Sequence, residues 1–224
     1  VTNPINIVSG SSGTKTINMS VSGGTSTWSG GFVLNDNVTL NVSTGSSGFS
    51  VTGGITGTGN FTVTGSGLNQ TFSTNPVNMS GVFTNSSSST STISGGVGSN
   101  VTGITNTGSG VISISTNPLT VNSSGTTLIN SASGIGKTIT VSAGVTGTGD
   151  LILKNNGTLN AAITFTTNSV NNTGKIINSG TGTGTISTNV SATMGTNVTE
   201  VVQNSTTSSL SFAGAITVGA TGKI

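Results

Sequence analysis

Residues 54–60 read GITGTGN, and residues 144–150 read GVTGTGD, a near copy ninety positions later. The correspondence continues in the same order, because FSTNPVN at residues 72–78 is matched by FTTNSVN at residues 165–171. Self-similarity at a regular spacing is typical of repeat architectures, in which similar units stack on one another. The repeat therefore favours a stacked fold.

The matched region extends beyond these two motifs. ISI at residues 112–114 corresponds to LSF at residues 210–212, so the offset grows from 90 to 98. Small insertions account for this drift, and a solenoid tolerates them because extra residues bulge at its corners. Residues 49–115 are therefore predicted to be duplicated as residues 139–213.

Short apolar alternations occur along the whole chain. Examples are INI at residues 5–7, VISI at residues 111–114 and ITV at residues 139–141. A period of two with Val, Ile and Thr is the pattern of a half-buried strand, and the Gly, Asn and Ser clusters between such segments predict turns. No apolar period of 3.6 residues is sustained, so we expect almost no helix.

The predicted fold class is all-β, a parallel β-helix of roughly ten short coils with roughly 20 residues each. At about 4.8 Å per coil the rod would be near 50 Å long. Val, Ile, Leu and Phe would point inward, and Thr, Ser and Asn outward. We expect residues 1–224 to form one solenoid, either complete or as a segment of a longer repeat protein. The alternatives are a β-sandwich or jelly roll, and a largely disordered or amyloid-like chain.

The three prolines share one context. Pro4, Pro76 and Pro118 each follow Thr-Asn and precede an aliphatic alternation. Proline cannot donate a ladder hydrogen bond but is tolerated at the first residue of a strand. Each Thr-Asn-Pro is therefore predicted to mark a corner that leads into a strand.

The composition excludes most catalytic chemistry. Thr occurs 44 times, Ser 37, Gly 36 and Asn 26, whereas Cys and His are absent. The usual ligands for zinc, haem and iron–sulfur clusters are therefore missing, as are Ser–His and Cys–His pairs. The carboxylates are Asp36, Asp150 and Glu200, spread along the chain. We therefore expect a protein that is not an enzyme, with no catalytic residue, no cofactor and no metal.

Charge and hydropathy bear on the partners. The five lysines form no basic patch, so no nucleic-acid partner is expected. No apolar run approaches the roughly 18 residues that span a membrane, so no membrane insertion is expected.

Three features of the sequence are candidate binding sites. Trp28, flanked by Ser and Gly, could stack on a sugar ring, although core packing is the more common role for a lone aromatic residue. Residues 147–150, GTGD, weakly resemble a calcium-binding nonapeptide, but Asp150 is better suited to a turn. The alternating residues 181–188, TGTGTIST, suggest an ice-binding face, but the Thr-x-Thr pieces are scattered and the corner lengths drift.

Residues 54–67, GITGTGNFTVTGSG, and residues 144–159, GVTGTGDLILKNNGTL, resemble the autotransporter-associated β-strand repeat of bacterial surface proteins. Residues 197–224 are similar to the same class. The resemblance covers about half the chain. It implies a β-solenoid at the cell surface or outside the cell, in a prokaryote, with a structural or adhesive role.

The predicted function is that of a structural subunit of an extracellular fibre or filament that assembles with itself end to end. Neither end of the sequence has a charge cluster. The sequence begins with a strand-like segment and also ends with one. The open edge of such a strand can pair with another chain. The candidate assembly residues are Val1, Pro4, Ile5, Ile7, Ile216 and Val218. The alternative is an adhesin that binds surface glycans through a lateral face, and ice binding is third.

Overall fold

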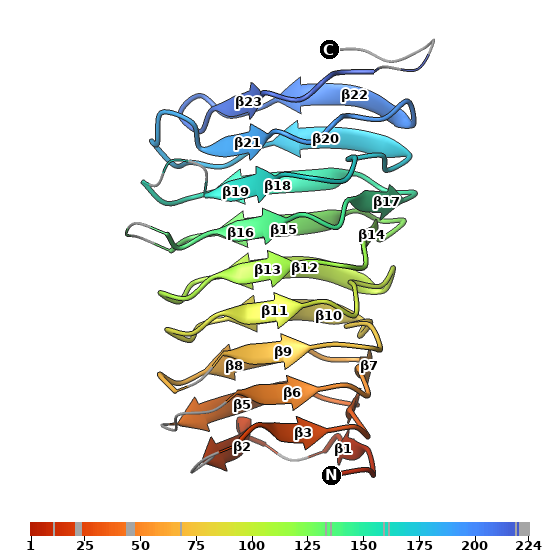
Figure 1. Ribbon diagram of the computed structural model, residues 1–224, viewed down its shortest axis with the longest axis vertical. Coiled ribbons are helices and arrows are strands. Elements are labelled where there is room, and N and C mark those ends of the chain that lie inside the picture. Colours follow the sequence, from red (N-terminus) through yellow and green to blue (C-terminus); the bar gives the residue numbers. More distant parts are fainter. Residues whose placement is uncertain are drawn as a thin grey trace.

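The computed structural model is a parallel β-solenoid (Figure 1) and describes residues 1–10, 12–20, 24–43, 48–67, 69–132, 134, 136–158, 160, 162–217 and 219. Its described residues form strands and turns without a helix. Every strand pair is parallel, which confirms the predicted fold class and excludes the antiparallel sandwich.

Each turn of the chain visits three faces, which we call face A, face B and face C. Face B is a nine-stranded sheet built from β2 (Lys15–Ser20), β5 (Val38–Ser43), β8 (Phe61–Thr64), β10 (Gly81–Asn85), β12 (Val101–Asn106), β15 (Thr126–Asn130), β18 (Leu151–Asn155), β20 (Gly174–Asn178) and β22 (Val198–Gln203).

Face C is a second nine-stranded sheet. It consists of β3 (Ser26–Trp28), β6 (Phe49–Val51), β9 (Gln70–Phe72), β11 (Ser91–Ile93), β13 (Ile112–Ile114), β16 (Ile139–Val141), β19 (Ile163–Phe165), β21 (Thr188–Val190) and β23 (Leu210–Phe212).

Face A is narrower, and in several coils it is reduced to a single bridge residue. Its strands are β1 (Ile5–Ile7), β4 (Phe32–Leu34), β7 (Ile55–Gly57), β14 (Leu119–Val121) and β17 (Val145–Gly147). Single bridges at Val77, Val97, Val170, Met194 and Ile216 complete an unbroken column that starts at Ile5.

The coils are fewer and longer than predicted. The first and ninth strands of face B are separated by eight turns, which at about 4.8 Å per strand gives a rod of about 38 Å. Phe83 pairs with Ile104, 21 positions later, whereas Leu128 pairs with Leu153, 25 positions later. Most of the additional residues lie at the corners, and the strands stay in register except for shifts at Gly81/Val82 and Gly174/Lys175.

Alternation along each strand builds one continuous core. In β5, Val38, Leu40 and Val42 are buried, whereas the residues between them are partly exposed. Aromatic residues fill the N-terminal half: the Phe61 ring lies 5.0 Å from that of Phe32, and 6.0 Å from that of Phe83. Such ring contacts add to the stabilisation from apolar burial.

In the described part of the chain, six fully buried asparagines contradict the expectation that Asn points outward, and four of them recur at one corner of the solenoid. Asn85, Asn106, Asn130 and Asn155 are fully buried and pair in register at the ends of successive face B strands. The Nδ2 atom of Asn106 donates to the Gly110 carbonyl at 3.0 Å. Each side chain lies at the B–C corner, where a turn leaves backbone groups without ladder partners. The buried amides therefore replace the missing backbone hydrogen bonds.

The Thr-Asn-Pro corners are as predicted. Pro4 precedes β1, Pro118 precedes β14, and Pro76 precedes the bridge residue Val77. The preceding Thr74 and Thr116 have φ of 69° and 72°, which is unusual for a β-branched residue. In each case the following Asn N–H donates to the carbonyl two residues back, closing a tight γ-turn.

The two segments of the predicted duplication occupy corresponding places. Ile55 and Val145 each begin a face A strand, and Phe72 and Phe165 each end a face C strand. All four side chains are buried. Every coil repeats these places, so the duplication stays a prediction from the sequence.

Candidate functional site

The N-terminal coil exposes residues that the interior coils bury. Ile5, Ile17 and Met19 are half-buried, whereas their ladder partners on the second coil are enclosed. Val1 and Val8 are 63% and 66% exposed. This end therefore combines open strand edges with apolar surface.

The predicted assembly residues at this end do not share one environment. Val1 and Pro4 are exposed and Ile5 is half-buried, but Ile7 lies in the core. The carbonyl of Val1 accepts the N–H of Ser29 at 2.8 Å, so residue 1 covers part of the β3 edge. The open edges are therefore mainly those of β1 and β2.

The C-terminal coil has a similar apolar surface. Val201, Leu210 and Phe212 are half-buried against the core, and Ile216, which bridges to Met194, is 40% exposed. Val218 lies outside the described residues. β22 is six residues long and β23 three, the same lengths as β2 and β3 at the other end. The two ends are therefore matched in strand length on faces B and C.

Lys15 places a charged side chain on the edge strand at the N-terminal end, which was not predicted from the sequence. Lys15 lies on β2 in the same ladder column as the buried Val38, and it forms an ion pair with Asp36. The hydrogen bond from Lys15, together with the Asn37 amide, holds the pKa of Asp36 below its usual value. A charge in a core column of an edge strand is a known means of limiting uncontrolled edge pairing.

A second ion pair lies on the outer surface of face B. The Lys175 Nζ is 2.6 Å from a carboxylate oxygen of Glu200. This hydrogen bond and the charge of Glu200 raise the pKa of Lys175, with a smaller contribution from Asp150. Asp150 accepts the backbone N–H of Lys175 at 2.8 Å, so its carboxylate joins two successive coils.

Trp28 is a core residue in this structure. Its side chain is 8% exposed, and its ring lies 5.3 Å from Phe32 and 5.0 Å from Phe49. With so little accessible surface, it offers no open ring face for a sugar.

Face C has a regular outer surface that the sequence analysis missed. The central residue of each strand points outward, and these residues pair in one register from β3 to β23. We call them column 1: Thr27, Ser50, Thr71, Thr92, Ser113, Thr140, Thr164, Asn189 and Ser211.

A second column lies beside it. The residue directly after each strand from β6 onward donates its N–H to the coil before it, which extends the register, and Ser29 after β3 donates to Val1. Column 2 consists of Ser29, Thr52, Ser73, Ser94, Ser115, Ser142, Thr166, Ser191 and Ala213. Hydroxyl–apolar–hydroxyl triplets, such as Thr92-Ile93-Ser94, are the signal that could have revealed this face.

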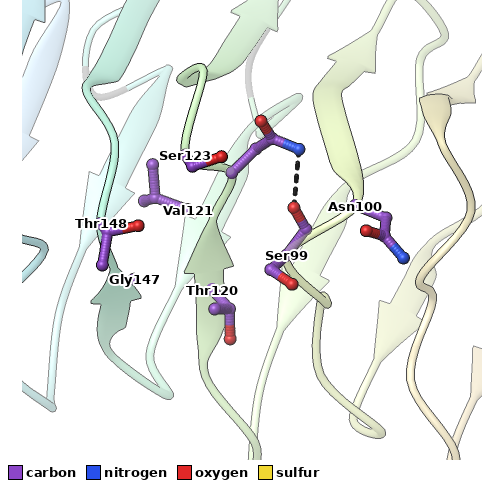
Figure 2. Close-up of a pocket in the computed structure, with 8 residues that line it drawn as sticks. Ser99, Asn100, Thr120, Val121, Ser123, Gly147 and Thr148 are labelled. Atoms are coloured by element: carbon purple, nitrogen blue, oxygen red, sulfur yellow. Dashed lines mark hydrogen bonds between the residues drawn. The ribbon is translucent and has the colours of Figure 1, made fainter.

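A shallow hollow of 370 Å³ lies at the A–B corner (Figure 2). It forms where residues 122–125 make an additional turn, and Asn122 Nδ2 donates to the Ser99 carbonyl at 2.7 Å. Its walls are hydroxyl, amide and backbone groups with Val121 as the one aliphatic side chain: Ser99, Asn100, Thr120, Val121, Asn122, Ser123, Gly147 and Thr148. The lining has no charged side chain for acid–base chemistry.

No cluster of three or more His, Cys, Asp or Glu residues is found among the described residues. That same part of the chain contains no helix with the length and hydropathy to cross a bilayer.

Comparison with protein-family models, curated proteins and solved structures finds no match to this chain. The class that the structure supports is therefore the β-solenoid itself.

Proposed function

We propose that the protein is a non-enzymatic structural subunit of an extracellular surface fibre in a prokaryote, and that it assembles with itself end to end. The apolar surface that the described residues leave on both terminal coils carries the proposal. Apolar side chains of the terminal coils, such as Ile17 and Leu210, are only half-buried, whereas their ladder partners in the interior coils are enclosed.

The geometry of the ends favours head-to-tail contact. A C-terminal coil placed on an N-terminal coil would set β22 against β2, which has the same length, and β23 against residue 1, which covers part of the β3 edge. Such a contact is heterologous and propagates into a filament. It would also enclose Leu210 and Phe212, so backbone pairing and apolar burial act together.

Charge offers little resistance to this contact. The formal net charge of the whole chain is +2, so long-range repulsion between subunits is weak. Lys15 enters the contact already paired with Asp36, which reduces the cost of enclosing its charge.

Sedimentation velocity over a range of protein concentrations tests the proposal. Ile216 and Ile186 are 40% and 42% exposed, but Ile216 lies at the C-terminal end and Ile186 at a lateral corner between β20 and β21. Assembly should be lost in Ile216→Lys and retained in Ile186→Lys. Wild-type protein that stays monomeric at high concentration, or equal loss in both variants, would refute end-to-end assembly.

A further inference from the structure

We propose that face C is an ice-binding surface, on which columns 1 and 2 order water into the lattice of an ice crystal. The inference does not depend on end-to-end assembly, because the array is complete within one chain.

The hydroxyl groups of face C are regularly spaced. Column 1 carries hydroxyl side chains in eight of its nine coils, with Asn189 as the exception, and column 2 in eight of nine, with Ala213 as the exception. Successive coils are about 4.8 Å apart, and residues two positions apart on a strand are separated by about 6.6 Å. These two spacings place the hydroxyl groups in a regular two-dimensional array. A two-dimensional array of one functional group fits a ligand that is itself a lattice of one small molecule.

Several column 1 hydroxyls have free hydrogen-bonding capacity. The hydroxyls of Ser50, Thr71, Thr92 and Ser113 make no hydrogen bond to any described residue, and all four side chains are partly exposed. Their main chains are fixed by ladder bonds on both sides, so their Cβ positions are held by the sheet. These hydroxyls are therefore fixed in place and available to water.

Face B differs from face C in its outward residues. Its outward column begins with Thr16, Thr39, Thr62, Thr84 and Thr105, but continues with Ile129 and Lys154. A neighbouring outward column runs through Ile152, Ile177 and Val202. Face B thus loses its hydroxyl array in the C-terminal half and carries charge, whereas columns 1 and 2 carry no charged residue.

The same features argue against a crystalline polysaccharide as the ligand. Surfaces that bind sugar chains use exposed aromatic rings for stacking, and columns 1 and 2 contain none. Trp28 lies between the columns in sequence, but its side chain points into the core.

Partition of fluorescently labelled protein into a slowly growing ice shell tests the proposal. Wild-type protein should be incorporated into the ice and should inhibit ice recrystallisation. Thr92→Lys, in the centre of column 1, should be excluded from the ice and lose most of the inhibition. Ser115→Lys in column 2 should behave in the same way.

Thr84→Lys is the matched control, because Thr84 is the outward residue of β10 on face B and is partly exposed like Thr92. It should enter the ice as wild type does. Circular dichroism must show that all three variants keep the β signal. Exclusion of the wild type from ice would overturn the proposal, as would equal loss in Thr84→Lys. Retention of the wild type on crystalline cellulose or chitin without incorporation into ice would overturn it as well.

Discussion

Replacement of Asn130 by alanine should strongly destabilise the solenoid, because its buried amide satisfies three backbone groups at a B–C corner. Nδ2 donates to the carbonyls of Lys137 and Ala162, at 2.8 Å and 2.7 Å, and Oδ1 accepts the N–H of Ala132 at 3.0 Å. Ala162 belongs to the next coil, so the side chain also joins two coils.

The magnitude follows from these contacts. Three hydrogen bonds at about 1 kcal/mol each give about 3 kcal/mol. The substitution also leaves the N–H of Ala132 buried without its partner, which adds about 1 kcal/mol. We expect the free energy of unfolding to fall by about 4 kcal/mol in total.

Urea denaturation measures this change. Trp28 is the one tryptophan, so its fluorescence reports the N-terminal coils while circular dichroism reports all coils. The two transitions must coincide before a single free energy is assigned, because repeat proteins can unfold in parts. Asn18→Ala is the control: Asn18 is exposed and accepts one hydrogen bond, from Asn41, so its loss should cost less than about 1 kcal/mol. Equal effects of the two substitutions would refute the structural role of the buried asparagines.

Phe61→Ala should lower the free energy of unfolding by about 4 kcal/mol, and Phe61→Leu by about a third of that, because Phe61 is fully buried among other rings. Urea denaturation measures both changes. Gly57 and Gly10 both have positive φ, but a Cβ at Gly57 would lie 2.0 Å from a backbone oxygen while one at Gly10 meets nothing. Gly57→Ala should therefore lower the melting temperature much more than Gly10→Ala; equal shifts would contradict the close packing of coils. The melting temperature should be constant between about pH 5 and 9. Stability from Asp36, whose pKa is lowered, is lost as pH falls below about 4, and stability from Lys175, whose pKa is raised, is lost above about pH 10.4. A marked change of melting temperature near pH 7 would show that another group controls folding.

The sequence predicts the solenoid because strand and turn signals are local. Alternations such as residues 139–141 determine which side chains can point inward, and the prolines of Thr-Asn-Pro cannot lie in the middle of a ladder. Both signals depend on the backbone of a few neighbouring residues, so they survive the drift in spacing between coils.

The coil length and the buried asparagines could not be predicted in the same way. Asn130 and Asn41 stand in similar Asn-rich alternations, yet Asn130 is buried and Asn41 is partly exposed. The difference arises at the corner, where Asn130 meets carbonyl groups of Lys137 and Ala162. Only the path of the next coil brings those groups together.

The hydroxyl columns of face C could not be recognised in the sequence because the corners between the strands vary in length. Thr92 and Ser113 are 21 positions apart, but Ser113 and Thr140 are 27 apart, so a fixed period does not align them. The backbone ladder restores the register because the additional residues are accommodated outside the strands. The expectation that scattered Thr-x-Thr pieces could not share one face was therefore wrong for face C.

Cryo-electron microscopy of the wild-type chain at high concentration tests the central claim most directly. End-to-end assembly predicts unbranched filaments in which the strands run across the filament axis. The ladder of face B should continue from one subunit into the next, with Ile216 enclosed at each junction. Isolated rods of about 38 Å, or filaments in which the rods associate only through their lateral faces, would contradict the claim.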